Sequence, residues 1–63
     1  MDDYELCDAI RAMTSPGLPV TLHTIKAGVL TEDKSRVEPF VRGMVANGEL
    51  AELPKGKFQK IQQ

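Results

Sequence analysis

The most regular pattern in the chain is a helical stripe of apolar residues in its second half. Val37, Phe40, Val41 and Met44 recur three and four positions apart, as on one face of an α-helix. Asn47-Gly48 follows, and glycine at that place is typical of a helix end. This spacing predicts a helix over residues 35–47 whose apolar face is buried.

The start of this helix has two candidate caps, Thr31 and Ser35. A cap at Thr31 would place Pro39 deep inside the helix, where proline removes a backbone hydrogen bond and clashes with the preceding turn. Ser35 followed by Glu38 has the form of a capping box and places Pro39 in the first turn or just after it. We therefore predict Ser35 as the cap. A preceding helical turn over residues 31–34, with a kink, stays open.

A hairpin pattern follows over residues 49–61. Leu50-Ala51-Glu52-Leu53 predicts one strand, Pro54-Lys55-Gly56-Lys57 a tight turn, and Phe58-Gln59-Lys60-Ile61 the returning strand. Phe58 is expected to cover the core. Phe58 and Ile61 are three positions apart and would face opposite sides of a regular strand, so a bulge, a curled end or an early stop is required.

The beginning of the chain predicts a first helix over residues 3–13. Leu6, Ile10 and Met13 recur at helical spacing, and Asp2 or Asp3 can accept hydrogen bonds from the first free amides. The segment 14–19 contains two prolines and a glycine, which cannot continue a helix and therefore predict a loop.

A short strand and a second helix are predicted next. Val20 after Pro19 suits a short strand. Thr21 suits the cap of a helix over residues 22–27, and Gly28 is expected to close it.

The order of these elements resembles the winged helix-turn-helix superfamily over nearly the whole chain. The resemblance is carried by Pro19-Val20-Thr21 before a short helix, Gly28-Val29-Leu30 as the turn, the apolar stripe, and Asn47-Gly48-Glu49-Leu50 at the entry to the hairpin. It implies an α+β winged helix in one domain, residues 1–63, with three helices and a C-terminal β-hairpin wing. The short length is similar to that of phage, plasmid and prophage regulators.

The resemblance implies that the chain is a small transcriptional, phage or plasmid regulator that binds double-stranded DNA. The third helix, over residues 35–47, would enter the major groove of the DNA while the wing contacts its backbone. Arg36 is the predicted base reader, because a guanidinium can make two hydrogen bonds to one guanine. The other candidate DNA contacts are residues suited to phosphate: Thr31, Lys34, Ser35, Arg42, Lys55, Lys57 and Lys60. Arg42 has a second interpretation, a surface ion pair with Glu38 four positions before it.

The charge composition weakens the DNA interpretation. The formal net charge is -1 and the sequence pI is about 5.7, whereas nucleic-acid-binding domains often exceed a pI of about 9. The charges are unevenly distributed, because every charged side chain among the first ten residues is acidic while Lys55, Lys57 and Lys60 lie near the end. Exposed lysines on a hairpin also deter strand-to-strand aggregation.

The alternative function is a protein-interaction or assembly module without direct DNA binding. Glu32, Asp33 and Glu38 lie close to the supposed reading surface and would repel phosphate. A homodimer would also enlarge the contact of a small domain with DNA. Three apolar residues near element ends are candidates for such a contact or for the core: Met13, Leu18 and Leu30.

Catalytic and metal-binding patterns are not found in the sequence. His23 is the only histidine, and Cys7, the only cysteine, lies on the apolar side of the first helix, where a buried thiol is expected. We predict no enzyme activity, no cofactor, no metal site and no small-molecule substrate. Because no apolar run approaches the roughly 20 residues that span a bilayer and the N-terminus is acidic, we predict a soluble, cytoplasmic protein without a membrane partner.

Overall fold

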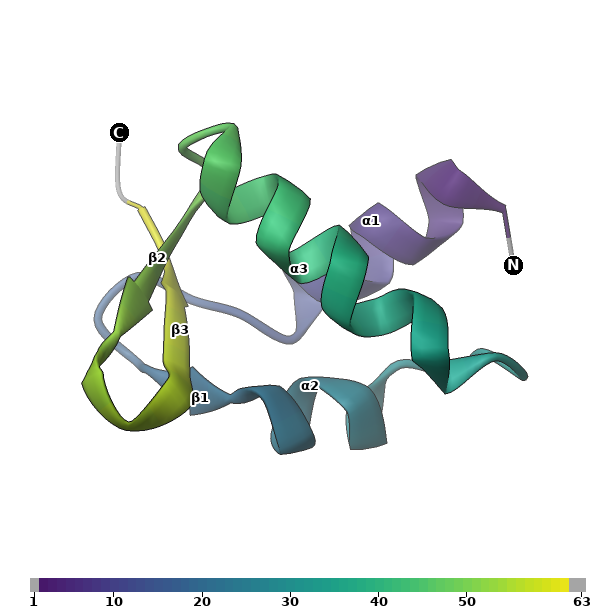
Figure 1. Ribbon diagram of the computed structural model, residues 1–63, viewed down its shortest axis with the longest axis horizontal. Helices are drawn as coiled ribbons and strands as arrows, with labels where there is room; N and C mark the ends of the chain where they lie inside the picture. Colours follow the sequence, from purple (N-terminus) through teal and green to yellow (C-terminus); the bar gives the residue numbers. More distant parts are fainter. Residues whose placement is uncertain (1, 62–63) are drawn as a thin grey trace.

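A computed structural model describes residues 2–61, which form three α-helices and one three-stranded antiparallel sheet (Figure 1). The elements are α1 (Asp3–Ala12), β1 (Val20–Thr21), α2 (Leu22–Gly28), α3 (Val37–Ala46), β2 (Leu50–Leu53) and β3 (Lys57–Lys60). A 3-10 turn, η1 (Lys34–Arg36), precedes α3, and a second one, η2 (Pro54–Gly56), joins β2 to β3. The predicted α+β class, the three helices, the hairpin and the first strand near Val20 are confirmed.

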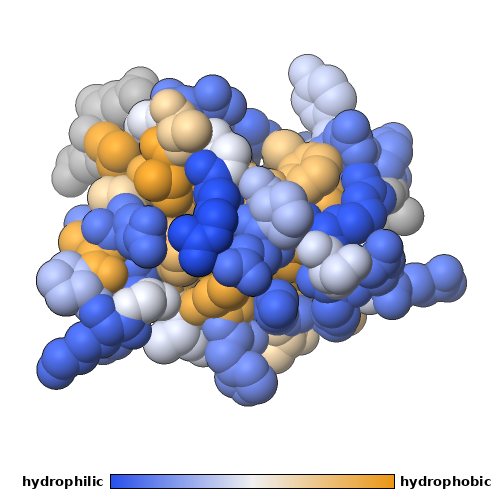
Figure 2. Space-filling view, viewed as in Figure 1, coloured by the Kyte–Doolittle hydropathy of each residue, from blue (hydrophilic) through white to orange (hydrophobic). Residues whose placement is uncertain are grey.

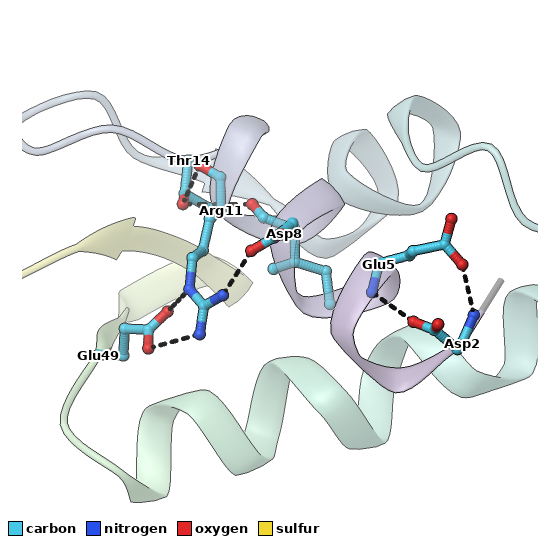
Figure 3. A network of polar contacts seen from close by, with 7 residues as sticks. Asp2, Glu5, Asp8, Arg11, Thr14 and Glu49 are labelled. Carbon is cyan, nitrogen blue, oxygen red and sulfur yellow. Dashed lines mark hydrogen bonds and ion pairs between the residues drawn. The ribbon is translucent and has the colours of Figure 1, made fainter.

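Helix α1 begins with a reciprocal cap. The Glu5 amide donates to Asp2 Oδ1 at 2.8 Å, and the Asp2 amide donates to Glu5 Oε1 at 3.1 Å (Figure 3). Two of the free amides of the first turn are thereby satisfied. Of the two predicted caps, Asp2 is the one used.

Helix α2 is capped by Thr21, as predicted. The Thr24 amide donates to Thr21 Oγ1 at 3.1 Å. Gly28 does not close the helix from outside but is its last residue, and Val29 is the C-cap with an extended backbone. Glycine at this position leaves room for Met13, because a Cβ on Gly28 would come within 2.2 Å of the Met13 side chain.

The predicted cap of α3 is wrong. Ser35 lies within η1, and Arg36 occupies the N-cap position of α3 without a side-chain cap bond. Asp33 caps η1 instead, accepting from the Ser35 amide at 3.1 Å and from the Ser35 hydroxyl at 2.5 Å. Helix α3 therefore starts two residues later than expected, with Pro39 in its first turn, where the missing amide costs little.

The end of α3 follows the prediction closely. Gly48 adopts a φ of 79°, in the left-handed region that favours glycine. The Glu49 amide donates to the Met44 carbonyl at 2.9 Å and the Gly48 amide to the Val45 carbonyl at 3.0 Å, which is the Schellman pattern. This cap turns the chain directly from α3 into β2.

The sheet has the strand order β1-β3-β2, so the last strand is central. Val20 pairs with Phe58, and Leu50 to Leu53 pair with Lys60 to Lys57. Since directly paired residues share a face, Leu50, Glu52 and Phe58 face one side of the sheet. Of the three options for the end of the hairpin, the early stop is observed, because β3 ends at Lys60 and Ile61 is 39% exposed.

The core joins all three helices to this face of the sheet. Its buried apolar residues are Leu6, Ile10, Ile25, Val29, Val37, Val41, Met44, Leu50 and Phe58. Met13 and Phe40 are only partly buried and pack against its edge. Met13 therefore completes the core, whereas Leu18 and Leu30 are 66% and 86% exposed.

A polar network ties α1 to the start of the hairpin (Figure 3). Arg11 Nε donates to Glu49 at 2.5 Å and Arg11 Nη1 donates to Asp8 at 2.8 Å. The hydrogen bonds from Arg11 lower the pKa of Glu49, and the nearby Lys60 charge acts in the same direction. Beneath this network the buried Thr14 hydroxyl donates to the Ile10 and Arg11 carbonyls and needs no other partner.

None of the helices formed by residues 2–61 has the length and apolar character needed to cross a bilayer.

Replacing Thr21 with alanine is expected to destabilise the fold by about 1 kcal/mol, because the Thr24 amide loses its acceptor. Ser35→Ala should cost less, since Ser35 does not cap α3. Urea unfolding at equilibrium measures both. A larger loss for Ser35→Ala would contradict the assigned caps.

Replacing Glu49 with glutamine is expected to destabilise the fold at neutral pH and to have little effect in acid. The folded-state pKa of Glu49 lies below its ordinary value of 4.5, so its contribution is present above that pH and is lost as pH falls through the folded pKa. Unfolding free energies at about pH 7 and at successively lower pH, down through the folded-state pKa, give the difference. Glu32→Gln, at an exposed position, is the control.

Candidate nucleic-acid interface

The tip of the hairpin presents two exposed lysines. Lys55 and Gly56 have φ values of 69° and 71°, and these two left-handed residues reverse the chain between β2 and β3. Lys55 and Lys57 are exposed, and within residues 2–61 neither forms an ion pair. Their charges are therefore directed to solvent at the tip, as a backbone contact requires.

Lys60 is separated from these two residues. It is half-buried at the opposite end of β3, pairs across the sheet with Leu50, and lines a hollow with Arg11 and Glu49. Its charge acts on Glu49. The structure therefore places Lys60 beside the α1–hairpin network and away from the tip.

Lys34 and Ser35 both lie on η1 and both make bonds within the chain. Lys34 Nζ donates to the Lys26 carbonyl at 2.6 Å and also to the Val29 carbonyl, so it satisfies carbonyls at the end of α2. The hydrogen bonds from Ser35 lower the pKa of Asp33. These contacts give both residues a structural role in the turn between α2 and α3.

Arg36, the predicted base reader, is directed toward α1. Arg36 Nη2 lies 2.5 Å from Asp3 Oδ1, and its guanidinium carbon lies 5.3 Å from the centre of the Phe40 ring. This geometry combines an ion pair with a cation–π contact. Arg36 must leave Asp3 before it can bind a base.

Arg42 projects from α3 toward the hairpin between two carboxylates. It lies 3.0 Å from Glu38 and 3.9 Å from Glu52 of β2. The predicted Glu38 pair is thus present, and the second acid was not anticipated. Exposed pairs of this kind contribute at most about 1 kcal/mol, so Arg42 can exchange its partners at small cost.

The predicted contacts fall into two groups in space. Lys34, Ser35 and Arg36 precede α3 at one end of the molecule, and the hairpin tip lies at the other end in Figure 1, whose horizontal axis extends 28 Å. Thr31 is half-buried in the turn after α2, where its amide donates to the Val29 carbonyl at 3.0 Å. Arg42 lies between the two groups on α3.

All three arginines of the chain, Arg11, Arg36 and Arg42, form ion pairs within it. Two of these contacts join residues more than thirty positions apart, Arg36 with Asp3 and Arg11 with Glu49. No local spacing reports such pairs, and this is why the sequence did not indicate them. Both arginines expected on the DNA-facing surface, Arg36 and Arg42, are therefore paired with carboxylates within the chain.

The positions of the single histidine and the single cysteine do not indicate a metal site. His23 is exposed on α2, and Cys7 is a half-buried free thiol rather than the buried one expected. In the part of the chain that the structure describes, no group of three or more His, Cys, Asp and Glu side chains is placed to hold a metal ion.

Comparison with protein-family models, with curated proteins and with solved structures finds no match for this chain.

Lys55→Gly is expected to stabilise the fold by about 0.5–1 kcal/mol, because a left-handed backbone penalises every residue with a Cβ. Lys57→Gly is the matched control. Lys57 has an extended backbone, with a φ of -100°, so glycine there should destabilise. Urea unfolding at equilibrium distinguishes the two signs, and a loss of stability in both variants would contradict the strain assigned to Lys55.

Proposed function

We propose that this chain is a winged helix that binds double-stranded DNA through the tip of its hairpin and the outer face of α3. The exposed Lys55 and Lys57 pair at the tip carries this proposal. The connectivity supports it: three helices are followed by a hairpin whose last strand pairs back onto the strand between α1 and α2. The tip is the wing of this arrangement.

The wing lysines provide the affinity. Each is a flexible point charge with three donors, suited to phosphate oxygens and not to base edges. Gly56 between them has no Cβ and lets the backbone approach a phosphate chain. Two such contacts give weak and salt-sensitive binding. The dissociation constant should lie within the non-specific range of about 10⁻⁴–10⁻⁶ M or be larger.

Helix α3 is the element that enters the major groove of the DNA in this proposal. Its side toward the hairpin carries Glu38 and Arg42, and the small residue Ala46 is exposed on the same helix. Arg42 can exchange its exposed carboxylate partners for a DNA phosphate at small cost. Glu38 then faces the DNA, where its carboxylate can accept a hydrogen bond from a cytosine amino group and repels phosphate groups.

Arg36 provides selectivity in this proposal. Its exchange from Asp3 to a guanine replaces an exposed ion pair by two directed hydrogen bonds. A site with guanine at this position is then favoured, and the chain acts as a regulator by occupying that site. This is a binding role and not an enzymatic one.

A protein-interaction module is the second candidate, and one observation favours it. An apolar groove between α1 and α3 is open to solvent beside the exposed Tyr4. This groove lies on a different side of α3 from Arg42, but Arg36 contacts Asp3 and Phe40 of its lining, so a partner in the groove would compete with base reading by Arg36.

The test is a backbone-amide NMR titration with a mixed-sequence DNA duplex at low and at higher salt. We expect shifts in residues 34–42 and 54–57 that fade as salt is added. The absence of shifts at low salt and high protein concentration would exclude DNA as a direct ligand.

Charge-neutral variants refine the same experiment. Lys55→Gln and Lys57→Gln should each reduce the slope of log K against log salt by about 0.9, the value for one phosphate contact. Lys60→Gln makes the same charge change at the far end of β3 and should leave the slope unchanged. An equal effect of all three would show that only net charge matters, against a contact at the tip.

A further inference from the structure

Arg36 is held by a carboxylate from a distant part of the chain. Its Nη2 donates to Asp3 Oδ1 at 2.5 Å, although 33 positions separate the two residues. Asp3 lies in the first turn of α1, and Arg36 directly precedes α3. Figure 1 shows that α1 and α3 begin at the same end of the molecule, and Figure 2 shows mostly hydrophilic side chains at this end. The fold therefore brings a carboxylate onto the arginine to which the proposed function gives base recognition.

The Asp3 carboxylate is not needed to start α1. Asp2 and Glu5 form the reciprocal cap of this helix and satisfy its first amides. The Asp3 side chain is 81% exposed, and within residues 2–61 its ion-pair partner is Arg36. A negative charge in the first turn adds only a small interaction with the helix macrodipole. Loss of this carboxylate should therefore change the state of Arg36 more than it changes the fold.

Phe40 gives Arg36 a second contact, of a different kind. The guanidinium carbon lies 5.3 Å from the centre of the Phe40 ring, and Phe40 packs against the edge of the core. A cation–π contact uses the positive charge of the guanidinium and none of its N–H donors. Phe40 can therefore keep Arg36 at the start of α3 while the acceptor of its N–H groups is exchanged.

A carboxylate offers an arginine the same chemistry as its DNA acceptors. A carboxylate has two oxygens, the major-groove edge of guanine has O6 and N7, and a phosphate has several oxygens, and each accepts from the guanidinium. Asp3 thus competes for donors that a DNA group would use. A second carboxylate is near, because hydrogen bonds from Ser35 lower the pKa of Asp33 and the charge of Arg36 adds to this effect.

Asp3 differs from the carboxylates that pair with Arg42. Glu38 and Glu52 lie on α3 and β2, the elements that carry the proposed contact surface. Asp3 lies on α1, outside the hairpin tip and the outer face of α3. Its charge can therefore be removed without changing a residue that would itself touch DNA.

We propose that Asp3 is an intramolecular competitor of DNA, an autoinhibitory contact that holds Arg36 in a closed ion pair and lowers the affinity of the chain for DNA. The inference rests on the proposed function, since both concern the same arginine. DNA binding exchanges the Asp3 carboxylate for a DNA acceptor while Arg36 stays on Phe40, and dissociation restores the pair. An exposed pair lowers affinity by roughly fivefold at most, so DNA can open this contact without another factor.

The test compares dissociation constants of wild type and Asp3→Asn, read from amide shifts in a titration with the mixed-sequence duplex. We expect Asp3→Asn to bind roughly twofold to fivefold more tightly at low salt. The difference should shrink at higher salt, because salt screens the exposed pair that the wild type must break. Thermal unfolding should show that the variant remains folded, and Asp3→Ser, which removes the same charge, is the second variant.

Asp8→Asn is the matched control. It makes the same charge change on the same helix, at a residue that pairs with Arg11 and not with Arg36. A gain that comes from net charge alone would appear equally in both variants and would overturn the proposal. We expect Asp8→Asn to bind nearly as the wild type does.

A double-mutant cycle shows whether Asp3 acts through Arg36. In the Arg36→Gln background, Asp3→Asn should bring no larger gain than Asp8→Asn, because the pair is already lost. An equal gain with and without Arg36 would mean that Asp3 only repels phosphate, against the proposal.

Two negative results separate this inference from the proposed function. If Asp3→Asn binds like the wild type while Lys55→Gln still weakens binding, the autoinhibitory contact is refuted and the DNA interface stands. If neither wild type nor Asp3→Asn shows shifts with DNA at low salt, both proposals fall together.

Discussion

The buried stripe of α3 is the surface on which the rest of the structure depends. Val37 and Val41 are fully buried and Met44 is 4% exposed, and α1, α2 and β2 all pack against this helix. A chain of this length buries only roughly 60% of the surface that its unfolded form exposes, so it has no second core to hold its elements. The inner side of α3 is therefore committed to folding and is not available to a ligand.

Ion pairs decide how much charge is left for a partner. Arg11 joins α1 to the start of the hairpin, Arg36 joins η1 to α1, and Arg42 lies between α3 and β2. The arginines thus hold elements together, while the exposed lysines of the hairpin tip remain available. In the proposed DNA complex, two such charges would give only weak and salt-sensitive affinity.

Most local features of the fold could be predicted from short stretches of sequence. The Thr21 cap, the Gly48 helix end and the turn at Lys55-Gly56 each depend on residues within a few positions. The prediction of Ser35 as the cap of α3 failed for a reason that is also local. Asp33 accepts hydrogen bonds from the amide and the hydroxyl of Ser35, and residues 34–36 form a 3-10 turn instead. A capping-box pattern does not reveal such a competitor.

The sequence by itself determined the order of the elements, the apolar stripe of α3 and the lysines of the hairpin tip, because periodicity and turn chemistry act over a few neighbouring residues. Only the tertiary structure decided which charges stay free. Arg36 pairs with Asp3 and Arg11 with Glu49 because folding brings distant segments together. Lys60 lies away from Lys55 because β3 runs from the hairpin tip toward the start of β2. The hollow that Cys7 of α1 shares with Phe40 and Gly43 of α3 has the same origin, since these two helices are far apart in the chain and lie side by side only in the folded structure.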